Sequence, residues 1–147
     1  MRARDLLAVF PAITEDTPVL EAARLLAEQD LPGLVVVDEH GGAARVVLGT
    51  QVLRLAVPGY CHDDPVLARV IDEQHADHFL DALAGRTLHE IPPLRQRELP
   101  VTDPDATVLE LAALMARTHS SLVAVVDGER LLGVVTFKGL LERGLAA

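Results

Sequence analysis

The sequence is poor in cysteine, in aromatic residues and in long apolar runs. Cys61 is the only cysteine, which excludes an intrachain disulfide and any site built from paired cysteines. No apolar stretch approaches the ~18 residues that a transmembrane helix needs. The chain starts with basic residues and a short apolar run, but Asp5 interrupts this run and no small-residue cleavage site follows. We therefore expect no signal peptide, no membrane partner and a cytoplasmic protein.

Positive charge is also scarce. The chain carries 13 Lys and Arg residues against 22 Asp and Glu residues, for a net charge of −9. An acidic surface repels phosphate backbones, so we expect no nucleic-acid partner. What the chain does contain is apolar mass, because half of its 147 residues are apolar and only 3% are aromatic. That is enough for a self-sufficient aliphatic core.

Motifs that carry catalysis are missing as well. The sequence has no GxSxG, no Walker lysine loop and no GxGxxG, and we expect no enzyme activity. Asp72, His75 and His78 step by three, share one helical face and have the side chains that zinc prefers. Two histidines on an exposed helix are nevertheless more typical of a solvated polar face. His75 and His78 are therefore weak candidates for metal ligands, and we expect no metal.

An internal repeat appears when the sequence is compared with itself at an offset of 89 residues. Four apolar segments match in order, and the matches include one glutamate and one aspartate. Dropping one residue in a loop brings the last two segments into line. The matched segments are 19–21 with 108–110, 34–38 with 123–127, 46–47 with 134–135, and 52–53 with 140–141.

Each repeat has the pattern of a β-α-β-β-α unit. Thr17-Pro18 predicts a helix start, and Thr107 with Glu110 has the spacing of a capping box. Two continuous β-branched runs, 34–37 and 122–126, predict buried strands. A unit of about 50 residues is too small to bury its own faces. We expect an α/β fold in which the two repeats pack sheet to sheet with pseudo-two-fold symmetry.

Residues 58–85 fall outside the repeat and predict a helical insertion. Asp64-Pro65 has the form of a helix start, and the apolar residues from Val66 to Ile71 predict a helical face that packs on the module. The expected division of the chain is therefore repeat 1 at 1–57, the insertion at 58–85 and repeat 2 at 86–147, all within one compact module.

The repeated motifs resemble those of the CBS domain pair, also called a Bateman module. The second repeat has Val108–Ala112, Val125–Gly128 and Leu132–Thr136, and the first has Val19–Ala23 and Val36–Asp38. The resemblance implies a stand-alone CBS domain-containing protein with a regulatory role. It also implies a homodimer, formed through the helical residues 109–115 and 140–141, and action through an unidentified effector protein or through its own oligomer.

The resemblance further implies a ligand. Members of this family bind adenosine-containing molecules between their repeats, with a Ser or Thr and an Asp three residues later on the ribose hydroxyls. Here Thr136 is present but Gly139 stands at the Asp position, and Leu48 and Gln51 take these places in the first repeat. We expect AMP, ADP, ATP or S-adenosylmethionine as ligand; the alternative is a ligand-free platform for dimerisation or docking. The candidate ligand-binding residues are Thr102, Ser120, Ser121, Leu122, Val123, Thr136 and Lys138 from the second repeat, and Ile13, Thr14 and Gln51 from the first.

Overall fold

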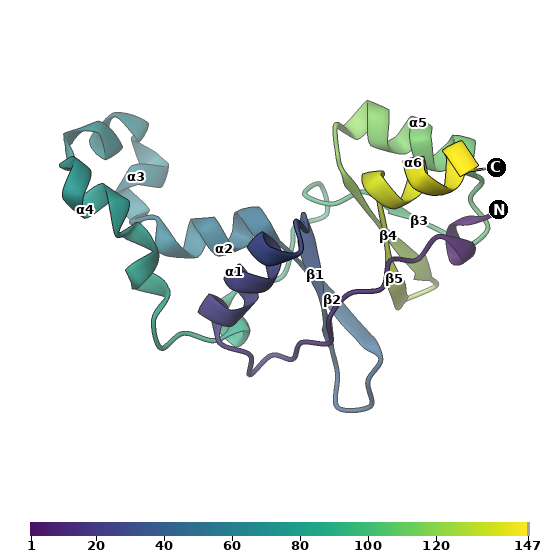
Figure 1. Ribbon diagram of the computed structural model, residues 1–147, viewed down its shortest axis with the longest axis horizontal. Coiled ribbons are helices and arrows are strands. Elements are labelled where there is room, and N and C mark those ends of the chain that lie inside the picture. Colours follow the sequence, from purple (N-terminus) through teal and green to yellow (C-terminus); the bar gives the residue numbers. More distant parts are fainter. Residues whose placement is uncertain (147) are drawn as a thin grey trace.

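The computed structural model describes residues 1–146 and contains two α/β halves and a helical arm that extends from the first half, away from the second (Figure 1). The expected β-α-β-β-α order is confirmed, although in the first half a single bridge from Ile13 to Val36 stands in place of the first strand. The first half contains α1 (Val19–Glu28), β1 (Gly33–Val37), β2 (Ala43–Leu48) and α2 (Gly49–Ala56). The second half contains β3 (Val101–Thr102), α5 (Val108–Thr118), β4 (Leu122–Asp127), β5 (Arg130–Thr136) and α6 (Phe137–Ala146).

The two sheets have the same register at equivalent positions. β1 and β2 pair antiparallel with Gly33 opposite Leu48, and β4 and β5 pair antiparallel with Leu122 opposite Thr136. β3 lies parallel to β4 on the other edge. The sheets meet where β2 contacts β5, and they share an apolar cluster there. The buried residues of this cluster are Val46, Leu99, Leu122, Ala124 and Val134.

The helix starts agree with the sequence only in part. Thr107 and Glu110 form the predicted capping box at α5, because the Thr107 hydroxyl accepts from the Glu110 N–H and the Glu110 carboxylate accepts from the Thr107 N–H. The prediction that Thr17 caps α1 is wrong. Its hydroxyl accepts from the N–H of Thr14 at 3.0 Å instead, and Pro18 occupies the N-cap. The Thr17 side chain therefore closes the preceding turn, and the N-cap of α1 has no side-chain hydrogen bond.

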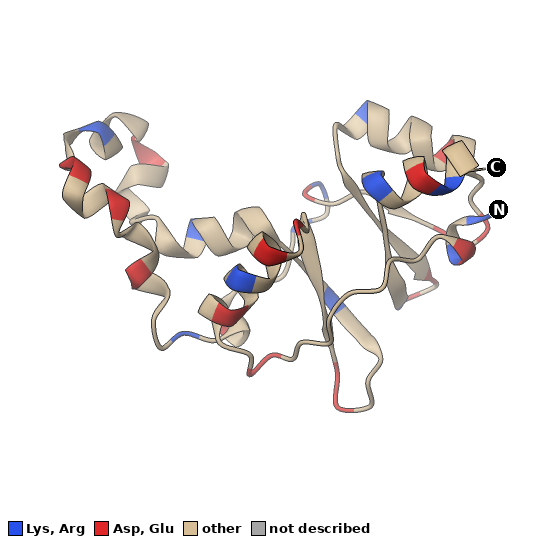
Figure 2. Cartoon of the chain, viewed as in Figure 1, with Lys and Arg blue, Asp and Glu red and all other residues tan. Residues whose placement is uncertain are grey.

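The insertion consists of short helical pieces that extend away from the two halves (Figure 1). The predicted apolar face over 66–71 is wrong, because Val66 and Val70 are 64% and 76% exposed on a 3-10 helix. Asp64 does start that helix, with its carboxylate accepting from the Val66 N–H. Figure 2 shows acidic residues spread over this arm. The pieces are α3 (Gly59–Asp63), η2 (Pro65–Val70), α4 (Glu73–Asp77) and η3 (Phe79–Leu83).

A short segment ahead of each repeat packs on the opposite repeat; we call residues 2–6 and 87–91 the lead-in segments. They contain the 3-10 helices η1 (Ala3–Asp5) and η4 (Leu88–Glu90). In the first lead-in segment, the Ala3 N–H donates to the Ala106 carbonyl oxygen at 2.8 Å. In the second, the Leu88 N–H donates to the Thr17 carbonyl oxygen at 3.0 Å. Since Thr17 and Ala106 are 89 residues apart, the two exchanges are equivalent.

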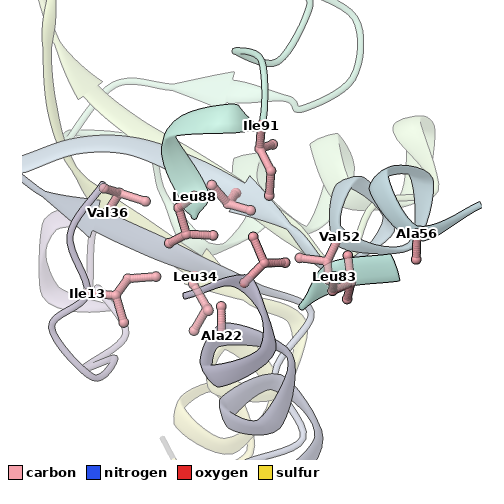
Figure 3. Close-up of a cluster of buried hydrophobic side chains, with 11 residues drawn as sticks. Ile13, Ala22, Leu34, Val36, Val52, Ala56, Leu83, Leu88 and Ile91 are labelled. Carbon is pink, nitrogen blue, oxygen red and sulfur yellow. The ribbon is translucent and has the colours of Figure 1, made fainter. Parts of the chain in front are cut away.

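The core of the first half depends on this exchange. Leu88 and Ile91 are 0% and 2% exposed, and they lie among the buried side chains of β1, α1 and α2. Figure 3 shows them in this cluster with Leu83 from the end of the insertion. Residues far along the chain therefore complete the first repeat. The cluster comprises Ile13, Val19, Ala22, Leu34, Val36, Val47, Val52, Ala56, Leu83, Leu88 and Ile91.

Candidate functional site

A cavity of about 210 Å³ lies where the two repeats face each other, and we call it the inter-repeat cavity. The second repeat contributes three of the predicted residues, Ser121, Thr136 and Lys138, together with Phe137. The first repeat contributes the loop Asp30–Pro32, which the sequence analysis missed. The offset of 89 maps this loop onto residues 119–121, so the repeat itself contains the signal that identifies it.

The loops that line the cavity follow the first helix of each repeat. Asp30 has φ of 51° and His119 has φ of 54°, so both repeats turn from helix to strand through one left-handed residue. Asp and His adopt this conformation more readily than most residues. After each turn, a loop carbonyl accepts from the first N–H of the closing helix: Pro32 from Gly49 at 3.0 Å, and Ser121 from Phe137 at 2.8 Å. The backbone thereby fixes the cavity wall.

Thr136 places a hydroxyl at the cavity and at the start of α6. Its Oγ1 accepts from the Gly139 N–H at 2.9 Å. A hydroxyl also has a proton to donate, and within residues 1–146 no acceptor takes it. A Cβ at position 139 would lie 3.0 Å from this Oγ1, so a larger residue there would push the hydroxyl aside. Thr136 therefore has one local bond and a donor left for a ligand.

Lys138, Ser120 and Ser121 differ in whether their side chains already bind other groups of the protein. The Lys138 side chain is 81% exposed, with Nζ 3.8 Å from Glu142 Oε1. Exposed pairs of this kind contribute little, so the ammonium is free to turn toward the cavity. The Ser120 hydroxyl donates to the Leu122 carbonyl oxygen at 2.7 Å and is used locally. Ser121 is exposed, and its hydroxyl makes no hydrogen bond within the described residues.

The remaining predicted residues lie away from the inter-repeat cavity. Leu122 and Val123 are 1% and 0% exposed core residues, and Ile13 is buried in the core of the first half. Thr102 pairs with Val125, three positions along β4 from Leu122 or about 10 Å. Thr14 lines a different cleft of about 490 Å³ beside the β1–β2 hairpin. The predicted ligand-binding residues thus include positions that the fold separates.

Gln51 and Arg45, at the equivalent place in the first repeat, are fully engaged by the protein. Gln51 Oε1 accepts from the Leu48 N–H and its Nε2 donates to the Pro92 carbonyl oxygen, both at 3.0 Å. The Arg45 guanidinium binds both Glu15 carboxylate oxygens at 2.8 and 2.9 Å. It also donates to the carbonyl oxygens of Leu88 and Ile91. Arg45 thereby holds the second lead-in segment in place, and Gln51 holds the residue that follows it.

The predicted metal-site residues Asp72, His75 and His78 make one contact among themselves. His75 Nδ1 lies 2.5 Å from Asp72 Oδ1, and both side chains are largely exposed, at 80% and 65%. His75 and His78 both line a shallow pocket of about 500 Å³. Within residues 1–146, no three His, Cys, Asp or Glu side chains are grouped so as to hold a metal ion. The same range contains no helix that is long and apolar enough to cross a membrane.

Paired β-α-β-β-α repeats with a cavity between them define the class of protein, and the comparison with known families identifies it. The CBS domain family matches residues 3–54 and 91–145, and the chain therefore belongs to the CBS domain family as a CBS pair. A CBS domain-containing protein of unknown function from Kribbella flavida is 46% identical, with 99% of each chain covered and a TM-score of 0.67.

Two more distant CBS structures contain bound ligands. CBSX2, known from Arabidopsis thaliana, is in complex with AMP; it is 19% identical, with 99% of this chain and 96% of that chain covered and a TM-score of 0.63. The CBS pair of protein MJ0100 is in complex with 5'-methylthioadenosine and S-adenosyl-L-methionine. It is 21% identical, with the same coverage and a TM-score of 0.56. At these identities the likeness shows the shared fold.

Proposed function

We propose that the chain is a regulatory module that binds an adenosine-containing ligand in the inter-repeat cavity. The observation that carries the proposal is the position of this cavity, which both repeats line and in which Thr136 retains a free hydroxyl proton. The ligands of CBSX2 and of the MJ0100 pair, AMP in one and two adenosyl compounds in the other, give the chemical class.

The side chains of the cavity suit the parts of such a ligand. Leu31, Pro32 and Phe137 form an apolar wall for a base, and the Thr136 hydroxyl bonds a ribose oxygen. The Lys138 ammonium reaches a phosphate oxygen as a point charge. The role is recognition, because these groups include no nucleophile with a base beside it.

The size of the cavity links binding to a change of shape. Small-molecule sites commonly measure about 300–1,000 Å³, and this one measures about 210 Å³. A ribose and its phosphate fit in it, and we propose that the binding of a whole nucleotide separates the repeats. A ligand that binds the opened form more tightly shifts the population toward it. The proposed signal is therefore the angle between the repeats.

A homodimer is the proposed route for that signal. Leu109, Phe137, Leu141 and Leu145 are 79%, 52%, 44% and 82% exposed on α5 and α6, two helices in contact with each other, and exposed apolar side chains that form a patch mark interaction sites. A groove of about 430 Å³ runs between these helices. Phe137 lines both this groove and the cavity, so occupancy of one alters the wall of the other.

The second candidate is a docking platform without a ligand. The observation that favours it is that, at the equivalent place in the first repeat, Gln51 and Arg45 make their hydrogen bonds to the protein itself. In this case the apolar face of α5 and α6 is the functional surface, and it receives a second copy of the chain or an effector protein.

Thermal denaturation and calorimetry with AMP, ADP, ATP and S-adenosylmethionine separate the two candidates. A ligand that binds only the folded protein raises its stability by about 2.7 kcal/mol at a hundred times Kd. We expect a saturable shift that Thr136→Val removes. The matched control is Thr107→Val, which loses an equivalent helix cap at α5 far from the cavity. The absence of a shift with every ligand at millimolar concentration overturns the sensor proposal.

A further inference from the structure

We propose that the helical arm is a docking surface for a partner protein and receives a cationic amphipathic helix of that partner. The apolar side of the helix inserts into the pocket of about 500 Å³ that His75 and His78 line, which we call the arm pocket. The CBS family matches residues 3–54 and 91–145, so the arm lies outside the repeats that define the family. The inference goes beyond the proposed function, because the arm pocket shares no residue with the inter-repeat cavity or with the groove between α5 and α6.

The arm exposes apolar side chains because it has almost no core of its own. Between residues 58 and 85, only Cys61 and Leu83 are buried. Leu83 belongs to the core of the first half, and so does Ala56, which ends α2 just before the arm. Both ends of the arm are thereby fixed to the first repeat, while most residues between them are exposed. The exposed apolar side chains of the arm are Tyr60, Val66, Leu67, Val70, Phe79 and Leu80.

The arm pocket offers a place where apolar side chains of a partner can insert. It lies among the end of α2 and the pieces α3, η2, α4 and η3, and its lining is mainly apolar and aromatic. Tyr60 and Phe79 line it, and both remain partly exposed. Val70 adjoins the lining residue Ile71 but lies outside the pocket and is exposed, so apolar surface continues beyond the pocket. A surface of this kind fits a helix with several apolar anchors better than it fits a small molecule.

The charges of the arm favour a cationic partner. Residues 58–85 contain six carboxylates and one arginine, and Figure 2 shows acidic residues along the arm. Two of these carboxylates cap helices, Asp64 at η2 and Asp72 at α4. The other four make no hydrogen bond or ion pair within residues 1–146, and they are Asp63, Glu73, Asp77 and Asp81.

Unpaired carboxylates beside an apolar surface attract lysine and arginine and repel other carboxylates. The whole chain has a net charge of −9, so a second copy of it is a poor occupant of the arm. A helix that carries basic residues next to its apolar side matches both the pocket and the charge.

Binding of a synthetic peptide to the full chain tests the proposal. The probe is a fluorescently labelled peptide of about 18 residues, with leucine along one side of its helix and lysine along the other, and fluorescence anisotropy measures its affinity. We expect saturable binding that weakens as salt is added, because salt screens exposed charges. A peptide of the same composition in scrambled order, and one with glutamate in place of lysine, are expected to bind about tenfold more weakly or worse.

Two tryptophan variants of α4 test whether the peptide uses the arm pocket. Ala76→Trp fills the pocket and is expected to weaken the affinity for the peptide about tenfold. The matched control is Gln74→Trp, which places the same side chain on the same helix but outside the pocket, and it is expected to change little.

Charge variants provide a second measurement, which decides the matter if Ala76→Trp does not fold. Asp77→Asn combined with Asp81→Asn is expected to lower the affinity for the peptide and to flatten its dependence on salt. The matched control, Asp127→Asn combined with Glu129→Gln, removes the same charge from the β4–β5 hairpin and is expected to keep both.

The proposal is wrong if the scrambled peptide binds as tightly as the amphipathic one, or if Ala76→Trp folds and binds like the unmodified protein. It is also wrong if sedimentation shows that the unmodified chain self-associates and that Ala76→Trp abolishes this, since a second copy then occupies the arm. None of these outcomes bears on the adenosine ligand, which is tested at a different cavity.

Discussion

The two repeats share one backbone plan but use different chemistry at the start of the closing helix. In the second repeat, the Thr136 hydroxyl caps α6 directly from the N-cap position. In the first repeat, Leu48 occupies that position, and the amide of Gln51 reaches back to the Leu48 N–H. The amide makes its second bond to the Pro92 carbonyl oxygen, so both its oxygen and its nitrogen are held by the protein. The comparison shows how one helix start can be stabilised with or without leaving a group for a ligand.

The β-hairpins of the two repeats, β1–β2 and β4–β5, also differ in the side chain that stands at one equivalent position. Arg45 in β2 binds Glu15 and two carbonyl oxygens of the second lead-in segment. Its counterpart in β5 is Gly133, and a Cβ there would approach the Leu7 side chain to 3.3 Å. The first repeat therefore uses a charged side chain of its hairpin to hold the second lead-in segment. The second repeat holds the first lead-in segment by charged groups outside its hairpin, since Arg4 pairs with Asp105 and Arg143 donates to the Asp5 carbonyl oxygen.

The largest expected effect comes from making the lead-in segments alike. Leu88 and Ala3 are equivalent, and both are fully buried. Leu88→Ala gives the first repeat the small residue of the second and leaves a cavity that costs about 2–5 kcal/mol in the free energy of unfolding. Urea denaturation followed by circular dichroism measures this loss. Val9→Ala, at a position that is 97% exposed, is the control and should change little.

A smaller loss is expected where the repeats meet. Gly33 and Leu122 are equivalent, and a Cβ on Gly33 would lie 2.8 Å from the Val47 carbonyl oxygen and 3.3 Å from Leu122. Gly33→Ala forces backbone to move and is expected to cost about 1–3 kcal/mol. Gly59→Ala has open space around its Cβ, so equal stabilities of the two alanine variants would contradict the assignment of this contact.

The smallest expected effect is on the stability of the protein at acidic pH. The Thr87 N–H donates to the Glu90 carboxylate at 2.9 Å and, with the neighbouring Arg86, lowers the pKa of Glu90 below its ordinary value of 4.5. A lowered pKa adds stability above that value, and this stability is lost as the pH falls through the folded pKa. Glu90→Gln keeps an acceptor in the capping box but does not titrate. Thermal melts of the variant should therefore depend less on pH below about 4.5.

The sequence predicted the repeats well and their contacts poorly. The offset of 89 located both hairpins and the helices before and after them, because apolar periodicity is local information. The lead-in segments were missed because Ala3 and Leu88 share no pattern and lie 85 residues apart, outside the common offset. Their hydrogen bonds go to the opposite repeat. The division of the chain at residues 57 and 85 stays a prediction.

The residues of the candidate site were likewise predicted only where they lie close together in the sequence. Thr136, Lys138 and Ser121 lie within 18 residues of one another and were predicted together, and they line one cavity. Asp30 completes this cavity from more than 90 residues away, and no spacing rule connects it to Thr136. Thr102 was included because it lies in the same repeat, but parallel pairing of β3 places it toward the far end of the sheet.

The reciprocal exchange of lead-in segments has a consequence for fragments that contain a single repeat. Two copies that each place a terminal segment on the other form a swapped dimer, and here both copies are joined in one chain. A fragment that contains only one repeat keeps a segment with nowhere to dock and lacks the segment that completes its own core. Dissecting the chain into single repeats is therefore expected to yield fragments that recover native packing only when they are mixed.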